Sequence, residues 1–288
     1  MDRILFGDNQ FFGVNHMSEE KARAQSMKFR DTAAIIKVLD QAYDLGLRTF
    51  MCTTHDKIGE VADHMRANPE RYADFIYYPG MPYAHKYANA VSELGVMETL
   101  KQFAPGGVME TVVRGAKSAI RKDAEDLMRM LVDAEMKRFA GLNAPVIFLQ
   151  NVVTDLLLGL GMHDMFRTFS DHVRATFGAE AGFFTMNLPM LADVLEKVGV
   201  ASPIICCNYN KIGFRMSGGI EAYDRVIETK DVRVVAMSVL ASGAIPPEEA
   251  IKWICEREQI RSIVFGASSV GNIRHTMELI GKYTRTPV

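Results

Sequence analysis

His55 and Asp56 are the residues of this sequence whose types and spacing best suit acid–base chemistry. They follow a β-branched and aromatic run that ends at Thr53, and an imidazole with an ordinary pKa of about 6.5 gains or loses a proton at neutral pH. Asp8, near the end of the first such run, is a candidate base, and Tyr78 is a candidate proton donor. Each also has a structural interpretation: Asp56 as a helix cap, Asp8 as a turn residue and Tyr78 as a packing residue.

Other polar side chains follow the remaining runs of strand-forming residues, and we expect them to bind a small-molecule substrate. These substrate-binding candidates are Asn9, His16, Gln150, Asn151 and Asn208. A rim rich in amides and imidazoles suits a polar metabolite with hydroxyl or carbonyl groups, with or without a phosphate, because each buried polar group needs a hydrogen-bond partner.

Two stretches of small residues near the end of the chain suit a phosphate group. Ser242 and Gly243 form the first stretch, and Gly266, Ser268 and Ser269 belong to the second. Backbone amides of small residues can approach a phosphate closely, and the helix predicted behind the second stretch adds positive potential at its N-terminus. The structural alternative is that these residues are needed only for tight loops.

The histidines and cysteines do not predict a metal centre. The fold could bring His16, His55 and Asp56 together, but no segment has the His-x-x-x-His or His-x-x-Glu spacing that places two ligands on one helix face. The four cysteines contain no Cys-x-x-Cys pair and lie among apolar segments, in the manner of reduced buried thiols. They are Cys52, Cys206, Cys207 and Cys255.

Composition is that of an ordinary globular protein. The chain has 288 residues, 48% hydrophobic and 24% charged, and a formal net charge of -2 without a basic block for nucleic acid. No run reaches the ~18 apolar residues of a membrane span, and the N-terminus lacks the apolar stretch of a signal peptide. We expect a cytoplasmic protein with neither a nucleic-acid nor a membrane partner, and the oligomeric state stays open.

Short β-branched or aromatic runs alternate with segments of helical periodicity, which indicates parallel strands joined by helices. Strands are predicted near residues 4–11, 48–53, 74–78, 145–150, 181–186, 203–208, 232–238 and 262–265. Eight such units predict a single (β/α)8 TIM barrel over residues 1–288, with a doubly wound open sheet as the alternative. Residues 83–142 are too long for one crossover, so we expect a helical insertion that helps to cap the site. Its amphipathic helix is predicted to run through Ile120, Leu127, Met130, Leu131 and Ala134.

Four consecutive segments of the second half resemble the last four strand–loop–helix units of the aldo-keto reductase family. Residues 182–189 (GFFTMNLP) resemble a strand that ends in Gly-Val-Ser-Asn-Phe, and residues 203–210 (PIICCNYN) resemble the type Val-Asn-Gln-x-x-Tyr-Asn. Residues 232–243 (VRVVAMSVLASG) and 263–269 (IVFGASS) resemble the types Val-x-Ala-Tyr-Ser-Pro-Leu-x-x-Gly and Ile-Pro-Gly-x-Ser. In the first half, the resemblance is limited to residues 42–50 (AYDLGLRTF).

The resemblance implies a barrel that binds NADP or NAD and reduces carbonyl compounds. The cofactor contacts that it implies here are Asn187, Ser238, Ser242, Gly243, Gly266, Ser268, Ser269 and Arg274. Arg274 is included because the basic residue of the family's eighth unit aligns with Asn272. The family's Asp, Tyr, Lys and His tetrad has no counterpart, since residues 51–55 read MCTTH and residues 76–79 and 148–151 read IYYP and FLQN.

Three functions remain open on this sequence. The resemblance favours an oxidoreductase that acts on a small polar carbonyl or hydroxyl metabolite without the conventional tetrad. The second is a non-redox isomerase, lyase or hydrolase in which His55 and Asp56 handle protons. The third is a catalytically inactive barrel retained for binding.

Overall fold

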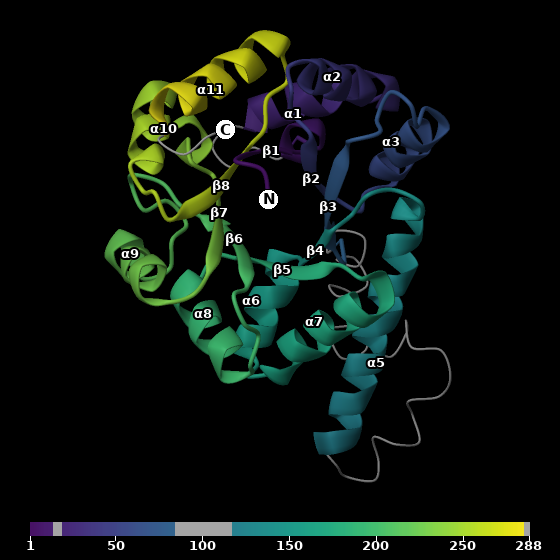
Figure 1. Cartoon of the computed structure of the whole chain (residues 1–288), viewed down its shortest axis with the longest axis vertical. Coiled ribbons are helices and arrows are strands. Elements are labelled where there is room, and N and C mark those ends of the chain that lie inside the picture. The colour runs from purple at the N-terminus through teal and green to yellow at the C-terminus, as the bar shows by residue number, and fades with distance from the viewer. Residues whose placement is uncertain (14–18, 84–116, 285–288) are drawn as a thin grey trace.

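Eight parallel strands form a closed barrel in the computed structural model, which describes residues 1–13, 19–83 and 117–284 (Figure 1). The strands are β1 (Ile4–Gly7), β2 (Thr49–Thr53), β3 (Ile76–Met81), β4 (Val146–Leu149), β5 (Glu180–Thr185), β6 (Ile204–Asn208), β7 (Arg233–Met237) and β8 (Ile260–Phe265). Each strand pairs with the next, and β8 closes the barrel by pairing with β1. The predicted TIM barrel is confirmed, and the open sheet is excluded.

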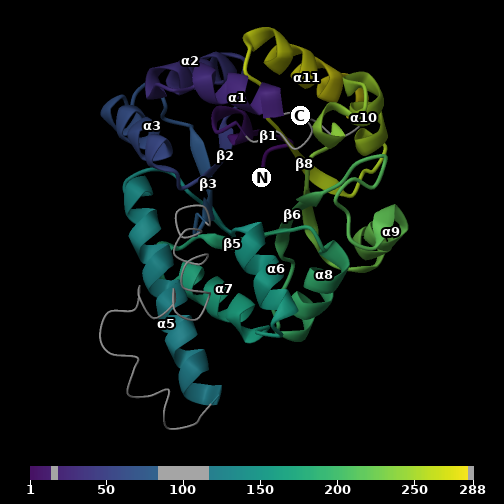
Figure 2. The same ribbon diagram turned by 180° about the vertical axis from the view of Figure 1, so that it is seen from behind.

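Helices surround the barrel in both views (Figure 2). They are α1 (Glu19–Lys28), α2 (Thr32–Asp44), α3 (Asp56–Ala67), α5 (Lys117–Met136), α6 (Asn151–Gly159), α7 (Asp164–Phe177), α8 (Leu188–Lys197), α9 (Gly219–Thr229), α10 (Pro247–Cys255) and α11 (Val270–Tyr283). Short 3-10 helices lie at η1 (Asn9–Phe11), η4 (Lys137–Phe139) and η5 (Ala241–Gly243). Across the described ranges, no helix is both long and apolar enough to cross a bilayer.

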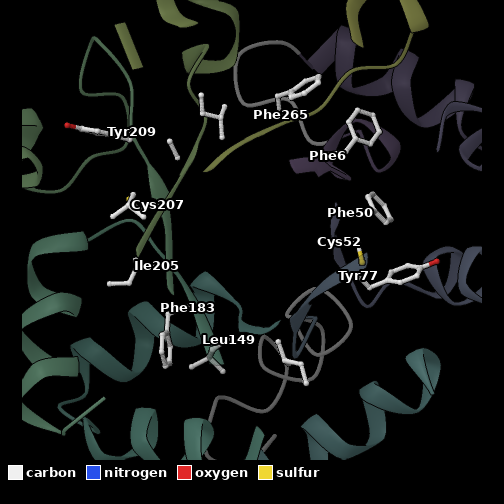
Figure 3. Packing of buried hydrophobic residues seen from close by; sticks show 14 of the residues in the cluster. Phe6, Phe50, Cys52, Tyr77, Leu149, Phe183, Ile205, Cys207, Tyr209 and Phe265 are labelled. Carbon is white, nitrogen blue, oxygen red and sulfur yellow. The ribbon is translucent and has the colours of Figure 1, made fainter. Parts of the chain in front are cut away.

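Alternation of side chains along the strands divides the core into two layers. The outer layer packs against the helices, and in Figure 3 its Phe6, Phe50, Tyr77, Phe183 and Phe265 point away from the barrel centre. The inner layer is built from Leu5, Met51, Tyr78, Val146, Phe148, Ile204, Cys206 and Val235. Both layers are largely apolar, so polar side chains for chemistry are left mainly to the loops at the strand ends.

Two strand glycines make room for aromatic rings inside the barrel. A Cβ atom at Gly182 would lie 2.5 Å from ring atoms of Phe148, and one at Gly80 would lie 2.8 Å from the ring of Phe184. The centroids of these two rings are 4.9 Å apart. The interior is therefore a packed core, and a ligand has to bind at the mouth.

The first strand is shorter than the sequence predicts. The pattern indicates a strand that reaches Phe11, but β1 ends at Gly7 and residues Asn9–Phe11 form η1. The 3-10 turn places the Phe11 ring 5.0 Å from that of Phe29, edge to face. Phe11 is buried by this packing although it is not in a strand. Its apolar side chain therefore extends the apolar run of β1 in the sequence, and the run is read as a longer strand.

The third strand lies later in the chain than predicted. Pro79 cannot donate a ladder hydrogen bond, which favours a strand that stops before it. In the structure β3 continues through Pro79 to Met81, because Gly80 and Met81 still pair with β4. The strand therefore ends three residues later than predicted, and Tyr83 lies just past its carboxyl end.

Helix α5 lies within the predicted insertion, but its buried face differs from the prediction. Buried apolar positions are Leu127, Met128, Val132 and Met136, whereas Ala134 is exposed. Glu135 also lies on the buried face and is only 2% exposed. The buried face of α5 therefore includes a carboxyl group, which a search for apolar residues alone does not find.

Candidate functional site

Asp8 is a buried carboxylate just past the carboxyl end of β1, where it is 6% exposed. Its Oδ2 accepts hydrogen bonds from the amide of Thr53, at 2.7 Å, and from the Thr53 hydroxyl, at 2.8 Å. Thr53 is the last residue of β2, so adjacent strands bring the pair together. Burial raises the pKa of Asp8 from its ordinary value of 3.8 to about 6, although the bonds from Thr53 act to lower it.

The charge of Asp8 changes the pKa of two neighbouring side chains, Cys52 and Tyr83. Burial and then the charge of Asp8 hold the pKa of Cys52 well above its ordinary value. The same two causes, in the same order, raise the pKa of Tyr83. Both groups remain protonated at neutral pH, and Asp8 is the member of the three that exchanges a proton there.

His55 caps α3 and forms part of an aromatic wall. Its Nδ1 accepts a hydrogen bond of 3.1 Å from the amide of Lys57, which satisfies one unpaired donor of the helix start. The imidazole stacks on Phe12 at 4.3 Å between centroids and meets the ring of Tyr83 edge to face at 5.6 Å. Burial lowers the pKa of His55, against the charge of Asp56, so the ring is neutral at pH 7 with its proton on Nε2.

Glu135 ties α5 to the ends of β2 and β3. Its carboxylate accepts hydrogen bonds from the hydroxyl of Thr54 and, at 3.1 Å, from the amide of Tyr83. Thr54 is also buried. Glu135 therefore fixes the chain between Thr53 and His55 and the segment that follows β3. Sequence reasoning missed it, although a glutamate inside a helical apolar stripe was a visible signal.

Asp56 faces away from this group. Its side chain is 80% exposed and accepts a hydrogen bond of 2.6 Å from Arg138 in η4. The cap of α3 comes from His55 and not from the side chain of Asp56. The structure therefore separates the predicted pair: His55 joins the aromatic wall, and Asp56 forms a surface ion pair.

Tyr78 lies inside the barrel, and its surroundings place it toward the other end. Burial raises the pKa of Tyr78 to about 12, and the charges that modify it are those of Asp2, Glu180 and Arg233. These three residues lie at or before the amino ends of β1, β5 and β7. The phenol of Tyr78 is therefore remote from Asp8, whereas Tyr83 follows the carboxyl end of β3.

The expected substrate-binding residues are distributed over the mouth. Asn9 is exposed on η1, and Gln150 and Asn151 begin α6. Asn208 is buried, and its Nδ2 donates 3.0 Å to the carbonyl of Arg215, so this amide holds its own loop. His16 lies outside the described residues.

The loop after β7 has an unusual backbone. Ser238, Ala241 and Ser242 have positive φ angles of 54°, 46° and 58°, and Gly243 follows at 92°. Residues with side chains adopt this conformation rarely, and it is concentrated at ligand-binding positions. The amides of Ala241 and Gly243 donate hydrogen bonds of 2.8 Å to the carbonyls of Ser238 and Leu240, so this backbone is held by its own turns.

The loop after β8 leads into α11, which Ser269 caps by accepting a hydrogen bond of 3.4 Å from the amide of Asn272. Gly266 and Ser268 precede this cap, and Arg274 is exposed on α11. The positive end of the helix dipole thus faces this loop, and the Ser269 side chain already caps one amide of the first turn.

Asn187 caps α8, with its Oδ1 accepting a hydrogen bond of 3.2 Å from the amide of Met190. The end of β5 before it is held by Asp155, which accepts hydrogen bonds from the Thr185 hydroxyl at 2.6 Å and from the Met186 amide at 3.1 Å. Burial raises the pKa of Asp155. Sequence reasoning missed Asp155 because nothing in the pattern indicates that α6 reaches β5.

Within the described ranges, no group of three or more His, Cys, Asp or Glu side chains has the arrangement of a metal site. Cys206 lies inside the barrel, next to Met51 at 3.9 Å between sulfur atoms. The exposed Lys211 forms an ion pair of 2.7 Å with Glu249.

No protein-family model matches the sequence, and no curated protein matches it significantly. Among solved structures, a putative aldo-keto reductase from Pseudomonas aeruginosa superposes with a TM-score of 0.63 at 12% identity, covering 98% of this chain and 90% of that one. An aldo-keto reductase from Bacillus halodurans gives a TM-score of 0.58 at 12% identity, with 99% and 88% coverage. One from Brucella melitensis gives 0.55 at 11% identity, with 99% and 90% coverage. The chain therefore has the fold of the aldo-keto reductases, in a highly divergent sequence.

Proposed function

We propose that this protein is an oxidoreductase that interconverts a carbonyl and a hydroxyl group of a small polar metabolite, with Asp8 as its proton-handling group. The observation that carries the proposal is the buried Asp8 carboxyl, with a pKa of about 6, at the mouth of an aldo-keto reductase barrel. General acid–base groups work best when their pKa lies near the working pH. Roughly a tenth of Asp8 carries its proton at pH 7.

The nucleotide in this proposal is NADP or NAD. The small residues Ser242 and Gly243 after β7, the small residues before α11 and the positive end of that helix support this choice. When bound, a nicotinamide supplies or accepts the hydride. Residues Ser238, Ser242, Gly243, Gly266, Ser268 and Ser269 are the ones that would hold it, with Asn187 and Arg274 as further candidates.

Asp8 transfers the proton in either direction of the reaction. During carbonyl reduction, the protonated carboxyl gives its proton to the substrate oxygen as the C–O double bond becomes single, and it is left as a carboxylate. During oxidation, the carboxylate takes the hydroxyl proton. The two hydrogen bonds from Thr53 stabilise the carboxylate and so keep its pKa from rising further.

His55 orients the substrate oxygen. It is neutral at pH 7 and presents its Nε2–H as a hydrogen-bond donor. Its contact with Tyr83 at 5.6 Å and its stacking on Phe12 restrict where this donor points. A fixed donor of this kind stabilises negative charge that develops on the oxygen.

The experiment is a titration with NADH and NADPH, followed by nucleotide fluorescence and by thermal shift. Saturable binding of at least one nucleotide is expected. The Asp8→Asn variant should bind it equally well and should lose at least about 100-fold in turnover with hydroxyaldehydes or hydroxyketones. No binding of either nucleotide would contradict the proposal.

A second candidate is a proton-transfer isomerase or lyase that uses the same mouth without a nicotinamide. The pKa of Asp8 supports this second candidate as strongly as the oxidoreductase, because a group that exchanges its proton near neutral pH serves either chemistry. Absence of nucleotide binding, together with stabilisation by a hydroxylated or phosphorylated carbonyl compound, would favour this candidate.

A further inference from the structure

Lys28 brings a cation to the loop after β8. It is the last residue of α1, and its Nζ donates a hydrogen bond of 2.5 Å to the carbonyl oxygen of Ser268. Lys211 and Lys230, by contrast, each pair with a carboxylate. Among the residues that the structure describes, no carboxylate pairs with Lys28. Its charge is therefore available to a bound anion.

The fold holds Lys28 at this position. Phe29, the next residue, is buried against Phe11 of η1. The carbonyl of Phe29 accepts a hydrogen bond of 2.8 Å from Lys57 of α3. The end of α1 is thus anchored on two sides, and α1 lies beside α2 in both views of the barrel (Figures 1 and 2).

Gln10 directs an unsatisfied acceptor at the same loop. It is 5% exposed, and its Nε2 donates a hydrogen bond of 2.7 Å to the carbonyl of Gly7. Its Oε1 then faces Gly266, where a Cβ atom would lie only 2.0 Å away. Within the described part of the chain, this Oε1 has no hydrogen-bond partner. Buried acceptors are normally satisfied, so the position calls for an N–H or O–H donor.

The third component is the start of α11. The helix has 14 residues, and the amides of its first turn have no partners within the helix. A cation, a helix N-terminus and an unpaired acceptor therefore meet at one loop. A nucleotide carries the complementary groups, since its phosphates are anions and its ribose hydroxyls are donors.

We propose that Lys28 supplies the positive charge that holds a nucleotide phosphate against the start of α11, while Gln10 accepts a hydrogen bond from the same ligand. The inference rests on the proposed function, in which that ligand is NADP or NAD. It gives to Lys28, from α1, the role that the sequence resemblance assigns to Arg274. Lys28 is thereby a residue that determines nucleotide affinity.

Calorimetric titration of the full-length protein with NADPH, NADH and pyrophosphate tests this inference. The Lys28→Gln variant keeps a donor for the Ser268 carbonyl but removes the charge, and Lys28→Arg restores the charge. Lys197→Gln, at an exposed position on α8, is the matched control.

We expect Lys28→Gln to raise the Kd of at least one dinucleotide about tenfold at low salt, with the loss fading as salt is added. Lys28→Arg and Lys197→Gln should stay within about twofold of the unsubstituted protein. An effect on NADPH alone identifies the 2′-phosphate as the partner, and an effect on both dinucleotides identifies the pyrophosphate.

Unchanged binding of all three ligands by Lys28→Gln would overturn the inference. Failure of the unsubstituted protein to bind any of them would overturn both this inference and the proposed function. Lys28-dependent binding of pyrophosphate, without binding of either dinucleotide, would support the anion site and refute the nicotinamide function.

Discussion

Replacing Asp8 by asparagine should make the protein more stable at alkaline pH. The folded-state pKa of Asp8 is raised from 3.8 to about 6 by burial, so the folded protein holds this proton more tightly than the unfolded chain. The stabilisation associated with the protonated form is fully present below pH ~4 and is lost as the pH rises through 6. The difference corresponds to roughly 3 kcal/mol in the free energy of unfolding.

Asparagine keeps an acceptor oxygen for the amide and hydroxyl of Thr53 but carries no charge to desolvate. Urea denaturation at pH 4 and pH 8 is the assay. Asp8→Asn should match the unsubstituted protein at pH 4 and exceed it by up to roughly 3 kcal/mol at pH 8. Asp56→Asn, on the exposed ion pair with Arg138, should change stability by less than about 1 kcal/mol at either pH. A deficit for Asp8→Asn that is equal at both pH values would refute the reasoning.

Two other substitutions probe the core and the support of the site. Gly182→Ala should lower the free energy of unfolding by roughly 1–3 kcal/mol, because its Cβ would collide with the ring of Phe148. Adding Phe148→Leu should recover part of this loss, and strictly additive effects of the two substitutions in urea denaturation would contradict the reasoning. Glu135→Ala should cost roughly 2–4 kcal/mol by stranding the Thr54 hydroxyl and the Tyr83 amide, with Glu135→Gln milder. Hydrogen exchange at the Tyr83 amide should accelerate in Glu135→Ala, and unchanged protection would exclude this role.

The barrel is predictable from the sequence because each of its units repeats one local rule. A segment with helical periodicity such as Thr32–Asp44 is followed by a short, almost fully buried run such as Thr49–Thr53. Eight repeats of this alternation leave a closed barrel as the simplest arrangement. Strand ends are less predictable. Phe11 is apolar because a 3-10 turn buries it, and Pro79 continues a strand that its chemistry disfavours.

The candidate site is predictable only in part. Asp8 and His55 are found because they follow strands, and parallel strands carry such residues to one end of a barrel. The direction of the neighbouring Asp56 depends on where Arg138 lies, 82 residues later in the chain. Glu135 likewise depends on the docking of α5 against Thr54. Contacts of this kind are set by packing between distant segments, which a local pattern does not encode.

The central claim is that the barrel mouth holds a carboxyl group whose proton exchanges near neutral pH. It is tested most directly by following the side-chain carbon resonance of Asp8 by NMR as a function of pH, with Asp8→Asn to assign the signal. We expect a midpoint at about pH 6. A midpoint near pH 4 would show an ordinary solvated carboxylate and would contradict the account.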